Sequence, residues 1–466
     1  MEVSDQGRGQ WGSKFGFIMA AAGSAVGLGN IWRFPYITGQ NGGGAFVLVY
    51  VICVVLIGIP MIFTELGLGR MSGTSTVGAF KKTGSNKFWM LAPFLALSVS
   101  FFVLTFYAVI GGWAVGYIFV TLFDYEITFA AFQQNPLIVL PLFAVFMMLT
   151  IGIVLGGVSG GIERASKILM PILFVLLILI SLRSVTLDGA MAGLEFYLIP
   201  DFSKITGTTI LMALSQAFFS MSVGWGIMIT FGSYLPKNSN LIESGLWVGF
   251  MDAAVALLAG FMIFPAVYAL SDNPDPGAGP TLVFETLPKI FEAMPAGGIV
   301  GGLFFLLLTV AALTSSISIL EVPASYFIDE KKWNRRKSAW VVGIFAFVIG
   351  IPSALTAIDG NFFNTLTIPW FGGESITGWF DILDTIFGSF FIVIVALMTS
   401  LYAGWIINYK KLIENLGMGN AMFSKPLIGS LTPAHVYGFM LRYIIPITIL
   451  LVLLNMIGVL GFFAGT

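Results

Sequence analysis

The sequence predicts an all-α polytopic membrane protein, on three observations of composition and pattern. First, 57% of the 466 residues are hydrophobic, only 10% are charged, and the mean hydropathy is +0.95. A soluble domain has about a quarter of its residues charged. Second, the chain contains apolar stretches of the length that crosses a bilayer, about 20 residues. Third, it shows no alternation at the spacing of barrel strands, and a helix pairs its backbone polar groups internally.

Eleven apolar stretches predict eleven spanning helices. They lie near 15–37, 44–69, 88–122, 135–157, 166–187, 208–234, 243–271, 298–327, 338–356, 381–408 and 437–464. The loops on the side of the N-terminus contain eighteen Lys and Arg residues, whereas those on the other side contain three, Arg183, Lys204 and Lys289. Positive charge is retained on the cytoplasmic side. We therefore expect a multi-pass protein of the plasma or inner cell membrane, with a cytoplasmic N-terminus and an extracellular C-terminus.

The first and sixth stretches are predicted to be interrupted by glycine. Gly23, Gly27 and Gly29 lie within about two turns of the first, and Gly224 and Gly226 repeat the Val-Gly-x-Gly pattern in the sixth. Each glycine disfavours a helix by roughly 1 kcal/mol relative to alanine. Two interrupted spans in corresponding positions indicate an inverted-repeat transporter with its binding site between them. The alternative is that these glycines serve only close helix packing.

This pattern predicts five parts of the chain. They are a cytoplasmic N-terminal segment (1–14), a first inverted repeat (15–187, helices 1–5), an extracellular loop (188–207), a second inverted repeat (208–408, helices 6–10) and an eleventh helix (437–464). A second outward connection, 272–297, combines breaker residues with a short amphipathic piece. It has the length of a structured lid, although a passive linker fits the sequence equally well.

A helix break in mid-membrane frees backbone groups that an intact helix would use. Free carbonyls can bind a cation or an ammonium group, and free amides can bind a carboxylate, so a zwitterionic amino acid fits both. Neutral hard oxygens nearby suit an alkali or alkaline-earth cation. These come from Asn30, Ser220, Ser222, Thr314 and Ser315.

Other classes of function have little support in the composition. The single cysteine, Cys53, and the single histidine, His435, exclude a disulfide framework and leave little for an enzyme. A net charge of −1 gives no argument for nucleic-acid binding. We expect no catalytic residues and no nucleic-acid partner.

Several ordered motifs resemble the neurotransmitter/sodium symporter family, and most closely its bacterial amino-acid transporters. They are GSAVGLGNIWRFP (23–35), NGGGAF (41–46), GIPMIFTELGLGR (58–70), GGIERASKILMP (160–171), SQAFFSMSVGWG (215–226) and ALTSSIS (312–318). The resemblance implies a LeuT-like 5+5 inverted repeat with broken helices 1 and 6, plus an eleventh helix. It also implies import of a neutral α-amino acid, coupled to two sodium ions by alternating access. Its partners would be the amino acid and the lipid bilayer, with no obligatory protein partner.

The resemblance assigns site residues by position. The first sodium site would use Ala25, Asn30, Ser220 and Asp252, and the second Gly23, Val26, Ala311, Thr314 and Ser315. Substrate would contact Ala25, Gly29, Val103, Tyr107, Phe219, Ser222, Trp225, Ser315 and Ile319. Arg33 with Asp384 would form the outer gate, and Arg8 with Asp329, flanked by Trp11 and Tyr234, the inner gate.

Four positions that depart from the family pattern bear on specificity. Asp252 replaces a common asparagine, and Ala256 a serine that helps to bind chloride in relatives, so we expect chloride-independent transport. Alternatively, a protonated Asp252 only bridges helices. Gly27 stands where monoamine carriers have an aspartate, which favours an α-amino acid over an amine. Trp225 replaces a frequent phenylalanine and predicts a small to medium, hydrophobic substrate side chain.

Two alternative functions on the same fold compete with sodium symport. Proton coupling is motivated by the intramembrane acids Asp252 and Glu321. A non-transporting amino-acid sensor is less well supported, because the cation ligands are retained. Glu65 matches a family glutamate that braces the unwound part of helix 6, although a proton-relay role is the alternative.

Overall fold

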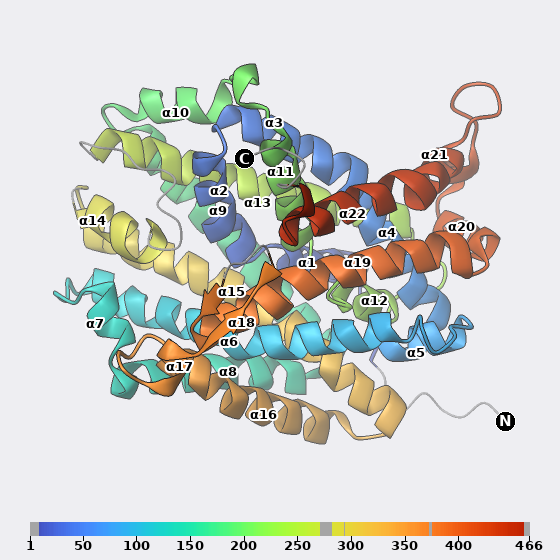
Figure 1. Cartoon of the computed structure of the whole chain (residues 1–466), viewed down its shortest axis with the longest axis horizontal. Helices are drawn as coiled ribbons and strands as arrows, with labels where there is room; N and C mark the ends of the chain where they lie inside the picture. Colours follow the sequence, from blue (N-terminus) through green and yellow to red (C-terminus); the bar gives the residue numbers. More distant parts are fainter. Residues whose placement is uncertain (1–8, 271–281, 293, 372–374, 461–466) are drawn as a thin grey trace.

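The long helices run side by side in one bundle, with α1 and α15 in its middle (Figure 1). The computed structural model describes residues 9–270, 282–292, 294–371 and 375–460. In this part of the chain nine helices are long and apolar enough to cross a membrane, or ten if one bent pair is counted as a span. The nine are α3–α4 (Gly44–Ser72), α6 (Leu91–Leu122), α8 (Pro136–Leu155), α9 with its preceding turn (Val158–Val185), α13 (Leu241–Leu270), α15 (Gly297–Lys331), α16 (Arg335–Leu355), α18–α19 (Trp379–Ile406) and α21–α22 (Pro433–Met456).

Helices 1 and 6 are broken, as the glycine pattern predicts. Helix 1 ends its first half, α1 (Lys14–Ala25), at an extended Val26 and resumes in a π-helical turn (Gly29–Arg33) that leads into α2 (Phe34–Gln40). Its two halves are bent by 50°. Helix 6 consists of α11 (Gly207–Ser220) and α12 (Ile227–Gly232), with residues 221–226 non-helical between them. In the described chain, the bent pair in helix 1 is the tenth candidate span, and the shorter helices α11 and α12 occupy the place of the sixth predicted stretch.

The two breaks require glycine for different physical reasons. In helix 6, Gly224 and Gly226 have φ of 86° and 75°, a conformation that other residues rarely adopt. In helix 1, a Cβ on Gly27 would lie 2.5 Å from Ser315 Oγ, and a Cβ on Gly29 would lie 2.8 Å from the Phe219 ring. Helix 6 therefore needs glycine for its backbone angles, whereas helix 1 needs it for close approach.

Three predicted helix boundaries were wrong by more than three residues, and the predicted end of helix 11 at 464 lies outside the described residues. The helix expected to end at 327 continues to Lys331, because its charged residues extend the helix beyond the apolar stretch. The helix expected over 166–187 begins at Val158, because the polar stretch before it continues as a π-helical turn (Val158–Glu163). The eleventh helix, expected from 437, begins at Pro433, where the Thr432 side chain caps its first turn. The latter two expectations failed because polar residues and proline were taken as loop.

The connections contain short helices and one hairpin. The helices are α5 (Thr76–Lys82), α7 (Phe129–Gln133), α10 (Ala190–Leu198), α14 (Leu287–Glu292), α17 (Phe362–Thr365) and α20 (Tyr409–Gly417). Strands β1 (Thr367–Pro369) and β2 (Ser375–Thr377) pair antiparallel, with Ile368 opposite Ile376. Much of the outward connection 272–297 lies outside the described residues, but its part at Leu282–Glu292 is helical, which favours a structured segment over a passive linker.

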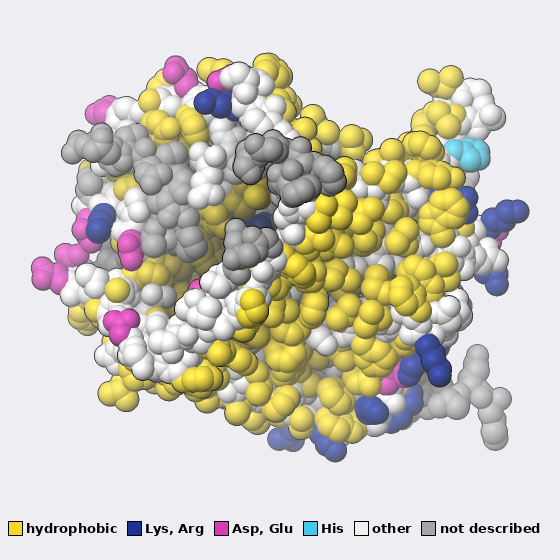
Figure 2. All heavy atoms as spheres, viewed as in Figure 1, with side chains coloured by type: hydrophobic (Ala, Val, Ile, Leu, Met, Phe, Trp, Pro, Cys, Tyr) yellow, Lys and Arg dark blue, Asp and Glu magenta, His cyan; other side chains and the backbone are white. Residues whose placement is uncertain are grey.

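Burial separates central from peripheral helices. In the most apolar stretch of 18 residues in α15, 89% of the stretch is buried inside the protein. In the corresponding stretches of α8, α9 and α21–α22 the buried share is 39% each. Figure 2 shows the matching surface, a broad hydrophobic band with most visible Lys and Arg side chains toward the end that holds α5 and α20. Helix α15 therefore forms the core against which both broken helices lie.

Candidate functional site

A small cavity lies where the breaks in helices 1 and 6 face α6 and α15. Its volume is about 20 Å³. It is lined by Ser24, Ala25, Gly27, Gly29, Tyr107, Phe219, Ser222, Trp225, Ser315 and Ile319. Eight of the nine residues predicted to contact substrate are in this set, and Val103 is not. Ser24 and Gly27 join it without having been predicted as substrate contacts.

The cavity presents free backbone groups of helix 1 beside hydroxyl groups. The Leu28 amide, after the break, donates to the Tyr107 hydroxyl at 3.3 Å. The Ser24 carbonyl, before the break, accepts from Ser222 Oγ at 3.0 Å and from Ser315 Oγ at 3.2 Å. One side therefore offers N–H and O–H donors suited to a carboxylate, and the other offers carbonyls suited to an ammonium group or a cation.

The predicted first cation site is assembled around a fully buried carboxylate. Asp252 Oδ1 accepts from Asn30 Nδ2 and from Ser220 Oγ, each at 2.8 Å, and Ser220 Oγ is also 2.8 Å from Oδ2. The Tyr50 hydroxyl lies 3.3 Å from Ser220 Oγ. Asp252, Asn30 and Tyr50 are all 0% exposed. A buried charge of this kind requires partners or a bound cation.

The amide of Asn30 is turned so that its nitrogen meets the acid. Its Nδ2 also reaches the Asp252 carbonyl at 3.0 Å, while its Oδ1 accepts from the Gly27 amide at 3.1 Å. The Asn30 Nδ2 group thus occupies the position at which a bound cation would contact Asp252. A rotation of the amide by half a turn would bring Oδ1 to the carboxylate side as a further hard ligand.

The predicted second cation site joins the end of α1 to α15. Ser315 Oγ lies 3.5 Å from the Gly23 carbonyl and 3.2 Å from the Val26 carbonyl. Thr314 Oγ1 lies 3.0 Å from the Ala311 carbonyl. Ser315 thus joins α15 to the end of α1, and Thr314 lies beside Gly23, since a Cβ on Gly23 would be 3.2 Å from Thr314 Cβ. The Gly23 carbonyl is freed by the end of α1 at Ala25.

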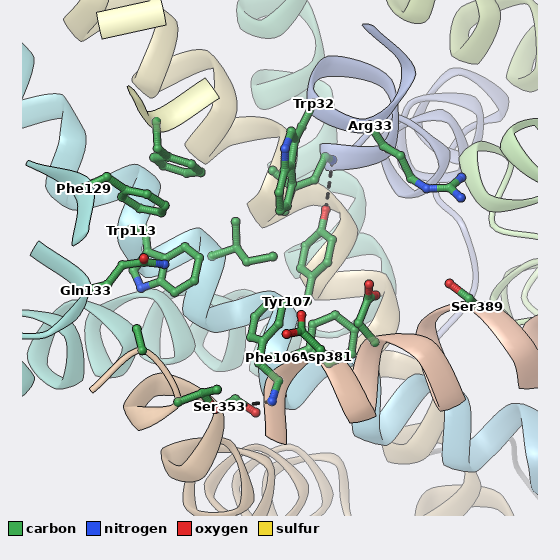
Figure 3. A pocket seen from close by; sticks show the side chains of 18 of the residues that line it. Trp32, Arg33, Phe106, Tyr107, Trp113, Phe129, Gln133, Ser353, Asp381 and Ser389 are labelled. Atoms are coloured by element: carbon green, nitrogen blue, oxygen red, sulfur yellow. Dashed lines mark hydrogen bonds between the residues drawn. The ribbon is translucent and has the colours of Figure 1, made fainter. Parts of the chain in front are cut away.

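A larger cavity of about 400 Å³ leads away from Phe219 and Tyr107. We call the end of the bundle that holds it the outer end. Figure 3 shows aromatic side chains around it, among them Trp32, Trp113 and Phe129, with the hydroxyl of Tyr107 turned toward the helix 1 backbone. The Phe219 ring lies between this cavity and the smaller one, since it lines both.

The predicted outer gate pair is not formed. Arg33 and Asp384 both line the larger cavity, but within the described chain they make no ion pair. Arg33 NH1 instead donates to Gln216 Oε1 at 2.7 Å, and its guanidinium lies 4.8 Å from the centroid of the Phe219 ring. Gln216 also donates to the Gly29 carbonyl at 2.8 Å. These contacts hold Arg33 on helix 6, and the outer end stays open.

The opposite end, which we call the inner end, is closed around Trp11. This side chain is 6% exposed, donates from Nε1 to the Phe231 carbonyl at 2.9 Å, and packs edge-on against Phe231 and Tyr234. Asp329 accepts from the Ser75 amide at 2.5 Å. Its predicted partner, Arg8, lies outside the described residues. Trp11 and Tyr234 are therefore in contact at this end, and the Arg8–Asp329 pair that they were expected to flank stays a prediction.

Glu321, for which the sequence suggested no definite role, is the centre of the inner contacts. Both oxygens of this fully buried side chain accept from Arg335, at 2.8 and 2.9 Å. The Tyr234 hydroxyl donates to the same carboxylate at 2.6 Å. This network joins α15 and α16 to the segment that follows α12, so it fixes the inner half of helix 6.

Two further acids bind the segment before α1 and the break in helix 6. Glu163 accepts from the Gly12 amide at 2.6 Å and from Ser13 Oγ at 2.8 Å, and pairs with Lys167 at 2.5 Å. Glu65 Oε1 accepts from the Gly224 amide at 2.8 Å, which is the bracing contact expected at the helix 6 break. The contacts of Glu163 with Gly12 and Ser13 could not be predicted from sequence spacing, because 151 and 150 positions separate the partners.

Three site contributors were missed from the sequence. Tyr50 lies in an apolar run, Gln216 lies two residues before the aromatic pair of helix 6, and Ser24 lies beside the break. A buried polar side chain inside a spanning segment is a functional-site hypothesis by default. That rule could have flagged Tyr50 and Gln216.

Comparisons with known proteins agree with this geometry. The model of the Sodium:neurotransmitter symporter family matches residues 8–134 and 130–460. An uncharacterized sodium-dependent transporter of Bacillus subtilis, YhdH, is 40% identical and the match covers 99% of this chain and 100% of the relative. One from Haemophilus influenzae is 37% identical, with 87% and 91% covered.

A solved structure is also similar. The crystal structure of MhsT in complex with L-phenylalanine shares 41% sequence identity and a TM-score of 0.85, covering 97% of this chain and 100% of MhsT. This similarity shows that the chain has a LeuT-like fold. The chain therefore belongs to the sodium:neurotransmitter symporter family and is a multi-pass, sodium-dependent symporter.

Proposed function

We propose that this protein imports a neutral α-amino acid with a small to medium, hydrophobic side chain, driven by two sodium ions and without chloride. The N-terminus would be cytoplasmic, so the outer end faces the extracellular side. The observation that carries the proposal is the pair of oxygen clusters, around Asp252 and around Ser315, on either side of one break in helix 1.

The backbone groups at this break suit the two charges of an amino acid. The Leu28 amide and the Tyr107 hydroxyl would receive the carboxylate, and the Ser24 carbonyl region the ammonium group. Gly27 supplies no acidic side chain there, so the negative group must come from the substrate. The binding of L-phenylalanine by MhsT supports the same class of ligand.

Trp225 supports a small substrate side chain. It is 3% exposed and packs edge-on against Phe219 at 5.9 Å between ring centroids. The cavity of about 20 Å³ between them has room for about one water molecule. Any amino acid therefore requires Phe219 or Trp225 to move, and the displacement grows with side-chain size.

Two sodium ions supply enough free energy for accumulation. Each cation yields about 2.3 kcal/mol per 100 mV of membrane potential, and a tenfold gradient adds about 1.4 kcal/mol. Two ions together would supply roughly 7 kcal/mol, or about 10⁵-fold accumulation. If the substrate carboxylate completes the first cation site, sodium and substrate favour the same state, as coupling requires.

Asp252 supports chloride independence. Its buried carboxylate already provides a fixed negative charge at the first cation site, and Ala256, one turn later, has no hydroxyl for an anion. A chloride ion placed there would be repelled in a region of low dielectric.

Proton coupling is the second candidate, because Asp252 and Glu321 are both buried acids. Sodium is favoured for two reasons. Both oxygens of Glu321 are already engaged by Arg335, and one of them also by Tyr234. The second cation group consists of neutral oxygens of Thr314 and Ser315 with carbonyls, which suit a metal cation better than a proton.

Purified protein in liposomes would test the proposal. Labelled neutral amino acids would be offered with an inward gradient of sodium, of protons or of chloride, each imposed alone. We expect accumulation under the sodium gradient only, unchanged when gluconate replaces chloride. Accumulation under the proton gradient alone would favour the second candidate, and no sodium-driven accumulation of any amino acid would contradict the proposal.

A further inference from the structure

A short hairpin between α20 and α21 (residues 425–432, called the inner hairpin below) stands out sideways from the bundle at its inner end (Figure 1). Its tip exposes three large apolar side chains: Leu427 is 64% exposed, Ile428 81% and Leu431 47%. Gly429 lies at the turn, and nothing described is within 4 Å of the place its Cβ would take. The tip therefore contacts little of the rest of the described chain.

The inner hairpin has a defined shape. The Leu427 amide donates to the Leu431 carbonyl at 2.7 Å, and the Leu431 amide donates to the Ile428 carbonyl at 3.0 Å. Its base is fixed, because Phe423 is 4% exposed and packs edge-on against Tyr437 at 6.0 Å. The apolar tip is therefore displayed in one direction by an ordered turn.

The position of the inner hairpin along the membrane normal follows from helix 11. Leu431 precedes Pro433, the first residue of that span, by two positions. Near its start, the same helix exposes Val436, Phe439 and Tyr443 by 39%, 58% and 45%. Because helix 11 is a candidate membrane span at the periphery of the bundle, these exposed side chains are placed to contact lipid, and the apolar tip continues their surface.

Aromatic and basic side chains mark the nearby membrane boundary. Trp405 packs edge-on against Tyr443 at 5.4 Å, and its Nε1 donates to the Arg442 carbonyl at 2.9 Å. Tryptophan, tyrosine and arginine are enriched at the level of the lipid headgroups. The inner hairpin directly precedes Pro433, the first residue of the same span and ten residues before Tyr443, and it extends sideways from the inner end of the bundle.

We propose that the inner hairpin inserts its apolar tip into the leaflet beside helix 11, at the boundary between headgroups and acyl chains. Segments that lie in this region reach about 5–10 Å into it. Insertion leaves few backbone groups without partners, because the turn has internal hydrogen bonds and Pro426 has no N–H. Lys425 can extend its ammonium group back to the lipid phosphates. The hairpin thereby anchors the start of helix 11 to the membrane surface.

A single spin label would measure the depth of the tip. Cys53 is the only cysteine of the chain, so a Cys53→Ser background gives one labelling site per variant. A nitroxide at Ile428→Cys would be compared with one at Lys411→Cys, an exposed position on α20, in liposomes of phosphatidylcholine and phosphatidylglycerol. Collision rates with oxygen, which concentrates in lipid, and with a water-soluble nickel complex would be recorded for each.

We expect the label at 428 to collide several-fold more with oxygen than with the nickel complex, and the label at 411 to show the reverse. A label at Leu431→Cys should behave like that at 428, which guards against a local disturbance by one substitution. Equal nickel accessibility at 428 and 411 would overturn the proposal. Protection at 428 that disappears when the protein is diluted to one copy per vesicle would also overturn it, because a second copy would then be the occupant.

Discussion

The outer and inner ends of the transporter differ in how their charges are paired. At the outer end, Arg33 and Asp384 line one open cavity and, in the part of the chain described, are not paired with each other. At the inner end, Glu321 is fully buried and is bound by Arg335 and Tyr234. The structure is therefore open on the outer side and closed on the inner side.

If transport proceeds by alternating access, as proposed above, this difference indicates where contacts must be exchanged. Breaking a buried ion pair costs about 3–5 kcal/mol, whereas an exposed pair contributes about 0–1 kcal/mol. An inward-open state that loses the Glu321 network must gain comparable contacts elsewhere. The pairing of Arg33 with Asp384, after release of Arg33 from Gln216, is the available compensation at the outer end.

The largest effect is expected from Glu321→Gln, which leaves Arg335 without its ionic partner. The loss of about 3–5 kcal/mol should shift the protein toward the inward-open state. A cysteine at Ile18 on α1, in the Cys53→Ser background, should then react faster with a thiol reagent from the inner side. Glu243→Gln is a matched control, because the Lys14–Glu243 pair is about half exposed on both sides. Equal effects of the two substitutions would contradict the assigned role of Glu321.

A smaller effect of opposite sense is expected at the outer end. Asp384→Asn removes the partner that Arg33 would gain on closure, so outer closure should lose about 1.5–3 kcal/mol. Amino-acid binding should persist while uptake falls by about tenfold to a hundredfold. Asp381→Asn, in the same cavity, is the control and should have less effect on uptake. Binding and uptake that fall together would show that Asp384 acts on the site itself.

The second cation site lies between the outer and inner ends of the bundle, and Ser315→Ala should weaken sodium binding there. It removes the hydroxyl that contacts the Gly23 and Val26 carbonyls, so the sodium concentration for half-maximal uptake should rise by about tenfold, or about 1.4 kcal/mol. Ser318→Ala is the control on the same helix, because that hydroxyl bonds only to the Thr314 carbonyl of its own helix. An unchanged sodium dependence of Ser315→Ala would remove the second cation site from the account.

The smallest effect concerns the substrate side chain. Trp225→Ala enlarges the cavity beneath Phe219, so competition by bulkier neutral amino acids should improve by about tenfold relative to alanine. Inhibition of labelled alanine uptake by a panel of amino acids would measure this. An unchanged order of preference would show that Trp225 does not set the size of the site.

Much of the site could be predicted because it depends on local sequence. The breaks at Gly27 and Gly224 follow from helix propensity, and the hydroxyls of Thr314 and Ser315 follow from their position on one helix. Contacts between distant helices could not be predicted in the same way. The partners of Glu321 and of Glu163 depend on how helices pack, which one sequence does not reveal. The gate pair at Arg33 was predicted but is absent from this outward-open arrangement of the described chain.

The central claim is that sodium and the amino acid bind one shared site, and equilibrium binding tests it most directly. Labelled neutral amino acids would be bound to purified protein over a range of sodium concentrations, and sodium affinity would then be measured with and without the best ligand. Linkage requires that each ligand increase the affinity for the other by the same factor. We predict that amino-acid binding depends strongly on sodium, and that Asn30→Ala, which removes a ligand of the first cation site, weakens this dependence. Equal amino-acid binding in sodium and in potassium would contradict the account.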